Sequence, residues 1–177
     1  MYQIQEKLRL VLFVASICSC SLAEAEQVTF SDNWTEQAFS LFSSNEFILN
    51  ADTLDISSEG TVSILWKRLP PSMWEANQAN WDWAVEASVP ATDLTVKGGD
   101  DRNLSIYFVF LPQEYLPKSN GKLTDLLNNK NVRVLMYVWG GDHARREVLP
   151  SPYLEEFGKV IILQSAGTGR ASEQVNL

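Results

Sequence analysis

The chain has 177 residues, a length typical of one domain, and 45% of them are hydrophobic, too many for a disordered chain. The formal net charge of −8 repels phosphate backbones, and the only basic clusters are the pairs Lys67-Arg68 and Arg145-Arg146. Nucleic acid is therefore excluded as a partner, because its recognition needs a basic patch.

Residues 1–25 have the pattern of an export signal. Lys7 and Arg9 supply its positive end, the apolar run LVLFVASI follows, and Ala23-Glu24-Ala25 fits a small-x-small cleavage site. The run is shorter than the roughly 20 residues that a transmembrane helix needs. We expect cleavage, no transmembrane segment, and a single periplasmic or secreted domain over residues 26–177. The alternatives are an N-terminal anchor or a buried helix.

Both cysteines, Cys18 and Cys20, lie in this leader, so the expected domain contains none. Such a domain enters an oxidising compartment without disulfides and depends on its core for stability. The leader sequence Ile17-Cys18-Ser19-Cys20 also faintly resembles a bacterial lipobox, although a cysteine two residues before Cys20 is unusual there. A lipid anchor is the lesser alternative.

Beyond the leader, the chain has the pattern of short strands broken by turns. Glycine-rich turns separate several of the apolar runs, and the predicted helices are two short segments, Glu36–Leu41 and Leu123–Asn129. This pattern predicts a mainly β fold, an antiparallel β-sandwich of jelly-roll or galactose-binding-like type with one or two short helices. The predicted strands, in chain order, are Glu46–Leu49, Leu54–Ile56, Gly60–Trp66, Trp81–Val89, Leu104–Leu111, Val132–Trp139 and Lys159–Gln164.

The clearest strand is Trp81–Val89, where Trp81, Trp83 and Val85 alternate with polar residues. That period of two is typical of a sheet with one face on a core. Both tryptophans are in phase with the valines, so we assign them to the core rather than to a binding surface.

Catalytic motifs are mostly absent from the sequence. His143 is the only histidine, which excludes a site of several imidazoles, and the glycine-rich turn around it predicts a solvated loop histidine. Asp100 and Asp101 are adjacent acids in a turn and could furnish oxygen ligands to calcium. The alternative is an ordinary turn in which an aspartate side chain bonds the backbone. A pair of carboxylates for glycoside hydrolysis can be found in any acidic chain, so that signal carries little information.

Aromatic residues give the candidate binding surface. Tyr107, Tyr137 and Trp139 lie opposite apolar residues of their own strands, so we expect them to face outward or into a groove and to stack on a sugar ring. Glu86 and Arg133 would supply polar contacts. The alternative is a second buried layer beneath a helix or loop.

These segments resemble the bacterial DUF 3047 family of exported domains of unknown function. The matching elements are Trp81-Asp82-Trp83, Gly99-Asp100-Asp101 with the strand Ile106–Phe110, Tyr137-Val138-Trp139-Gly140-Gly141, Leu149-Pro150-Ser151-Pro152-Tyr153 and the strand Val160–Leu163. Together they cover most of residues 53–177. The resemblance implies a secreted or periplasmic β-sandwich and brings no activity, substrate or catalytic residue.

The chain departs from the family pattern in two places. Gly169-Arg170-Ala171-Ser172 stands where a tryptophan is expected before Glu173, and the pattern continues beyond Leu177 with further strands. Residues 166–177 are polar and predict no closing strand. We therefore expect a domain truncated at its C-terminus, whose open apolar edge would be prone to aggregate.

Together these features predict an exported, non-catalytic binding module for a carbohydrate-like ligand. One alternative is a glycan hydrolase that uses Asp100 or Asp101 with Glu86 or Glu173, and another is a structural or protein-binding component. Calcium is the one cofactor that the sequence suggests.

Overall fold

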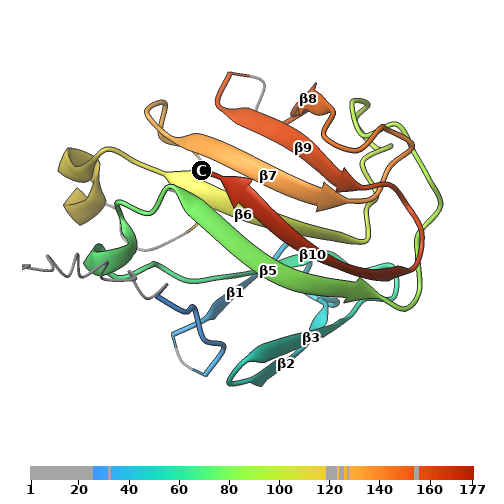
Figure 1. Ribbon diagram of the computed structural model, residues 1–177, viewed down its shortest axis with the longest axis horizontal. Helices are drawn as coiled ribbons and strands as arrows, with labels where there is room; N and C mark the ends of the chain where they lie inside the picture. The colour runs from blue at the N-terminus through green and yellow to red at the C-terminus, as the bar shows by residue number, and fades with distance from the viewer. Residues whose placement is uncertain (1–25, 32, 119–122, 124–125, 127, 154–155) are drawn as a thin grey trace, which may run out of the picture.

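The computed structural model describes residues 26–31, 33–118, 123, 126, 128–153 and 156–177 (Figure 1). The expected leader lies outside these ranges. No helix within them is both long and apolar enough to cross a membrane. The fold is mainly β, as predicted, and its strands are β1 (Thr35–Ala38), β2 (Glu46–Asn50), β3 (Thr53–Ser57), β4 (Ser63–Trp66), β5 (Gln78–Val85), β6 (Leu104–Phe110), β7 (Arg133–Trp139), β8 (Val148–Pro150), β9 (Gly158–Gln164) and β10 (Gly169–Asn176).

The largest sheet has four strands in the order β6-β7-β9-β8 (Figure 1). Its pairs are antiparallel except β7 and β9, which run parallel, so the antiparallel expectation fails at that pair. The reason is the connection over residues 140–157, which returns the chain to the start of β9 and includes the short strand β8. Because β8 pairs with the outer side of β9, the crossover also forms one edge of the sheet.

Both faces of this sheet are buried. Val134, Met136 and Val138 of β7 lie in a first core, which also contains Ile162 of β9 and Leu94 from a loop. The alternate residues of β7 and β9 face a second core. A strand that is apolar on both faces is typical of a sheet covered on both sides.

A two-stranded ribbon of β5 and β10 covers the second face (Figure 1). Trp83 packs edge-on against Trp139 with ring centroids 5.5 Å apart, and Trp81 lies 5.7 Å from Tyr137. The prediction that both tryptophans of β5 belong to the core is confirmed.

Strand β10 corrects the prediction that residues 166–177 contain no closing strand. It pairs antiparallel with the whole of β5, from Gly169 opposite Val85 to Asn176 opposite Gln78. Its polar residues have low strand propensity, but propensity yields to context when a long partner strand and a core face are available.

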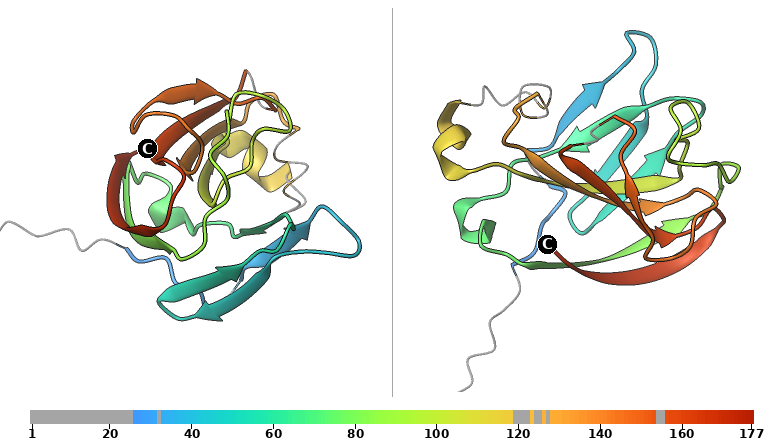
Figure 2. Two further views of the ribbon diagram at one scale, coloured as in Figure 1. Left: turned by 90° about the vertical axis from the view of Figure 1, so that its right-hand side faces the viewer. Right: turned by 90° about the horizontal axis from the view of Figure 1, so that it is seen from above.

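The N-terminal part forms two further ribbons, β1 with β4 and β2 with β3, which Figure 2 shows at one side of the molecule. The predicted helix Glu36–Leu41 is wrong, because Thr35–Ala38 is the strand β1. A six-residue segment is too short to form a stable helix unaided, whereas β4 offers it a complete ladder of hydrogen bonds.

Other helical structure is short. The turns η1 (Pro71–Met73) and η2 (Gln113–Lys118) are 3-10 helices. Of the second predicted helix, Leu123–Asn129, residues 124, 125 and 127 lie outside the described ranges, while Leu123 and Leu126 are helical.

Candidate ligand-binding groove

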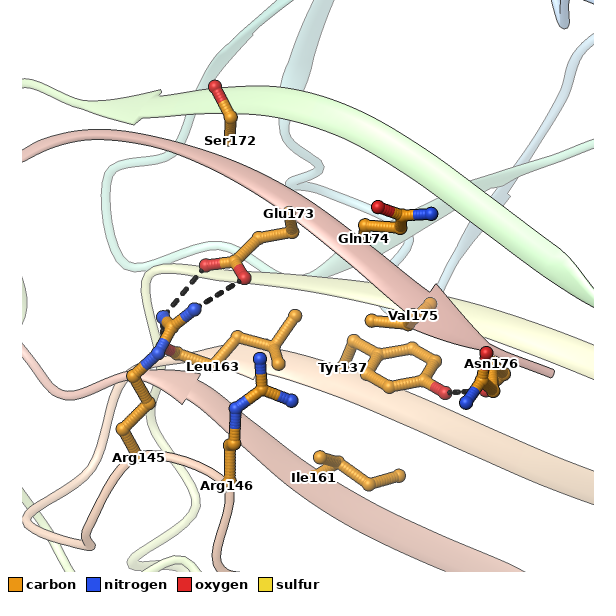
Figure 3. Close-up of a pocket in the computed structure, with 10 residues that line it drawn as sticks. All are labelled: Tyr137, Arg145, Arg146, Ile161, Leu163, Ser172, Glu173, Gln174, Val175 and Asn176. Atoms are coloured by element: carbon orange, nitrogen blue, oxygen red, sulfur yellow. Dashed lines mark hydrogen bonds and ion pairs between the residues drawn. The ribbon is translucent and has the colours of Figure 1, made fainter.

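A groove runs between β10 and β9 because the two-stranded ribbon leaves part of the four-stranded sheet uncovered (Figure 3). Its volume is about 510 Å³. We call it the β9–β10 groove, and its lining residues are Tyr137, Arg145, Arg146, Ile161, Leu163, Ser172, Glu173, Gln174, Val175 and Asn176.

The floor of the groove is apolar and comes from the second core. Ile161 and Leu163 of β9 and Val175 of β10 contribute aliphatic side chains, and Tyr137 of β7 contributes its ring. The Tyr137 hydroxyl donates a hydrogen bond of 2.7 Å to the backbone carbonyl of Asn176 (Figure 3). Burial raises the pKa of Tyr137 above its ordinary value, so this hydroxyl keeps its proton at neutral pH.

One end of the groove holds a compensated ion pair. The Arg145 guanidinium donates to both carboxylate oxygens of buried Glu173, over 2.9 and 2.8 Å, and to the carbonyl of Leu163. Gln164 Nε2 donates to the same carboxylate over 2.7 Å. Burial raises the pKa of Glu173, but the hydrogen bonds from Arg145 and Gln164 outweigh it and hold that pKa below its ordinary value. Glu173 is therefore ionised at neutral pH.

The neighbouring Arg146 has no such partner. Its backbone adopts a left-handed φ of 67°, and its backbone N–H donates a hydrogen bond of 2.6 Å to the carbonyl of Ile162. Figure 3 shows the Arg146 guanidinium next to Leu163, between Arg145 and Tyr137. Across the part of the chain that the structure describes, no hydrogen bond or ion pair joins its guanidinium. Its charge contributes to the lowered pKa of Glu173 without direct contact. The groove lining thus holds two arginines and one carboxylate, which leaves an excess of positive charge there in a protein with net charge −8.

The comparisons with known proteins match the chain to one family. A family model described as a protein of unknown function (DUF3047) covers residues 26–176. The chain belongs to the DUF3047 family. No curated protein and no solved structure matched it.

The aromatic residues that the sequence predicts as a binding surface do not lie together on one surface of the protein. Tyr137 and Trp139 are only 5% and 4% exposed and lie in the second core, so the buried-layer alternative holds for both. Tyr107 lies on the opposite face of the sheet, because its register partner is Met136. Its hydroxyl accepts a hydrogen bond of 2.7 Å from Arg102. Of the three, only Tyr137 reaches the groove.

The predicted polar contacts are also dispersed. Arg133 begins β7, at the end of the strand remote from Trp139, and its guanidinium lies 5.6 Å from the ring centre of Phe157. Glu86 is exposed and follows the last residue of β5. Neither residue lines the groove.

The structure places Asp100 in a hydrogen-bonded turn. Its Oδ1 accepts from the backbone N–H of Gly98 over 3.2 Å and from the Tyr153 hydroxyl over 3.0 Å, and its Oδ2 lies 3.6 Å from Arg102. Asp101 accepts a hydrogen bond from Thr92 at its backbone carbonyl. Within the described ranges, no group of three or more histidine, cysteine, aspartate or glutamate residues is placed to hold a metal ion.

His143 is not the solvated residue that its glycine-rich loop predicts. Its side chain is 13% exposed, and its Nε2 accepts a 3.1 Å hydrogen bond from the backbone N–H of Leu94. Asp93, Asp142 and Glu147 place carboxylate oxygens 3.4, 3.6 and 3.7 Å from its ring nitrogens. The histidine thus joins the loop before β6 to the loop after β7, away from the groove.

Sequence reasoning named Arg145, Arg146 and Glu173 but not the site that they form. The sequence presents the arginines as a basic pair too small for nucleic acid, and Glu173 as one member of a possible catalytic pair. A usable signal was the period-two pattern Ala171, Glu173, Val175, which places a carboxylate on the inward face of a strand and so requires a cationic partner.

Proposed function

We propose that this DUF3047 domain is a non-catalytic binding module of the cell envelope that holds an anionic ligand in the β9–β10 groove. The observation that carries the proposal is the excess of positive charge in the groove lining, where Arg145 and Arg146 face the single carboxylate of Glu173 and only Arg145 bonds to it. An unpaired arginine in a concave, partly apolar site matches a carboxylate in charge and in hydrogen-bond geometry. The envelope location rests on the leader pattern of residues 1–25.

The groove supports binding better than hydrolysis. Glycoside hydrolysis needs two carboxylates, of which one donates a proton, and Glu173 is the only carboxylate among the groove-lining residues. Glu173 is ionised and held by Arg145 and Gln164, so it has neither the proton nor the freedom of a general acid. Glu86, Asp100 and Asp101 do not line the groove.

A carbohydrate-like ligand fits this proposal only in an acidic form. A sugar ring cannot stack on Tyr137 or Trp139, because both aromatic rings are buried. The polar residues Ser172, Gln174 and Asn176 line the groove and could bond hydroxyls, and Arg146 would bind a uronate carboxylate. We also propose that the packed ribbon and sheet form a jelly-roll-like sandwich.

The test is calorimetric titration of the purified protein with two anionic probes, tri-galacturonate and a blocked peptide that contains one glutamate. At least one probe should bind, and Arg146→Gln should weaken that binding at least about tenfold, the loss expected for a charged hydrogen bond. Arg170→Gln is the matched control, because Arg170 lies at the exposed start of β10 outside the groove lining.

Two outcomes would overturn the proposal. One is that neither probe binds the folded wild-type protein. The other is that Arg146→Gln and Arg170→Gln weaken binding equally, which would assign the attraction to overall charge rather than to the groove.

A further inference from the structure

We propose that the occupant of the β9–β10 groove is an extended acidic peptide that adds to the free edge of β10 as a further strand. This inference rests on the proposed function, because it names the ligand class of the same groove. It follows from the backbone of β10, from the space beside that strand, and from the charge at the end of the groove.

The backbone of β10 presents N–H and C=O groups of its second edge to the groove. Within the described ranges, β10 pairs with β5 on one side only. The N–H of Leu177 donates to the carbonyl of Asn77, which places the odd-numbered residues of this segment in hydrogen-bonded pairs with β5. Since bonding alternates along an antiparallel strand, the N–H and C=O groups of Ser172, Gln174 and Asn176 point to the other edge.

The Tyr137 hydroxyl confirms this direction. It donates to the carbonyl of Asn176 from the groove side, so the groove and the free edge of β10 coincide (Figure 3). The peptide groups of Gln174 and Ser172 lie two and four residues upstream with the same orientation. A strand that pairs here would bond to these two residues.

An added strand would lie in the β9–β10 groove. A strand added to a sheet lies about 4.8 Å from its neighbour. On this side of β10 the groove is lined by Ile161 of β9, which is half-buried, and by Leu163, which is only 1% exposed. An added strand would place a side chain on Ile161 and would extend the cover of the four-stranded sheet from two strands to three.

Charge specifies the chemistry of the peptide. Arg145 and Arg146 both line the groove, where Glu173 is the single carboxylate and bonds directly to Arg145 alone. A peptide with alternating apolar side chains and one aspartate or glutamate near Arg146 would match both the floor and the charge. The main chain would supply affinity and the acidic residue would fix the register, the division of roles found in strand addition.

The probe for the experiment is a blocked eight-residue peptide of alternating threonine and valine in which one threonine is replaced by glutamate. Amide hydrogen exchange followed by NMR should show that Ser172 and Gln174 gain at least tenfold protection on binding. Glu173 and Val175 should change little, because their N–H groups already bond to β5. The control is tri-galacturonate, which has no peptide groups to pair with the edge.

N-methylation of the peptide sharpens the experiment. Only alternate N–H groups of an added strand face β10, so methylation of one alternate set should weaken binding at least tenfold while the other set leaves it unchanged. On the protein, Gln174→Pro removes an edge N–H and should abolish binding, whereas Gln174→Ala should retain it. If Gln174→Pro does not fold, the two methylated peptides decide the question.

The outcomes separate this inference from the proposed function. Peptide binding that depends on Arg146 but gives no edge protection, or binding of tri-galacturonate alone, would overturn strand addition and leave the anionic groove standing. A dimer in sedimentation whose Ser172 and Gln174 amides are protected without peptide would assign the edge to a second copy and also overturn the inference. If neither probe binds, both proposals fail.

Discussion

The two ends of this DUF3047 chain use the same kind of strand in different ways. From Gln78 onward, strands form a sheet buried on both faces and a ribbon packed against it. In residues 26–66, the described strands form two ribbons without one fully buried residue, and Leu41 and Phe42 are almost completely exposed. A two-stranded ribbon is stable only when a further layer covers it. The difference shows that stability in this molecule comes from layering rather than from strand pairing.

The first prediction compares isoleucines in the two regions. Ile162 is 0% exposed in the first core and Ile48 is 53% exposed on β2. Ile162→Ala should lower the free energy of unfolding by about 2–5 kcal/mol, because it removes buried methyl groups and leaves a cavity. Ile48→Ala should change it by no more than about 0.5 kcal/mol. Urea denaturation measures both, and equal losses would contradict the layered account.

The second prediction compares two glycines of similar backbone conformation. Gly141 (φ 77°) and Gly60 (φ 64°) are both left-handed, so alanine adds a similar conformational strain at each. A Cβ at Gly141 would lie 2.7 Å from Cγ of Leu94, while at Gly60 it would meet open space. Gly141→Ala should therefore lower the free energy of unfolding by about 1–3 kcal/mol more than Gly60→Ala does, which is the usual range for overpacking. Equal melting temperatures for the two variants would show that the Leu94 contact is readily relieved.

Strands could be predicted from the sequence in both regions, since predicted segments overlap β2, β3 and β4 as well as the strands of the buried sheet. β5, β6, β7 and β9 have five or more residues with strong apolar patterns, because each faces a core. β1 and β8 are short, and β10 is polar, so their local sequences do not distinguish strands from loops. Their pairing depends on partners far along the chain. Each residue of β10 pairs with a residue of β5 that lies 84 to 98 positions earlier.

The site was harder to predict because it depends on register. A period of two shows which residues of one strand share a face, but not which face of the next strand joins them. Tyr107 and Tyr137 were therefore grouped together, whereas the register opposite Met136 and Ile106 separates them across the sheet. The Arg145–Glu173 pair joins residues 28 positions apart through the parallel crossover, which no local pattern reveals.

The third prediction compares how pH changes the contribution of one carboxylate from each region to the stability of the fold. Glu173 is buried and paired, and Glu46 is exposed on β2. Because the folded pKa of Glu173 lies below its ordinary value of 4.5, ionised Glu173 stabilises the fold above that pH. This contribution is lost as the pH falls through the folded pKa. Solvent screens the pair, because the Arg145 side chain is 44% exposed. We therefore expect Glu173→Gln to lower the free energy of unfolding by about 1 kcal/mol at pH 7.

Measured against pH, the stability difference between wild type and Glu173→Gln should be constant near neutrality and should shrink as the pH falls below about 4.5. Glu46→Gln is the matched control and should shift stability little at any pH, because no core layer covers β2. A Glu173→Gln difference that stayed constant down to pH 3 would show that the amide loses packing or hydrogen bonds rather than an ion pair. The charge of Glu173 would then not be needed to hold Arg145 and Gln164 in place. Its packing and hydrogen bonds alone would maintain the groove beside Arg146.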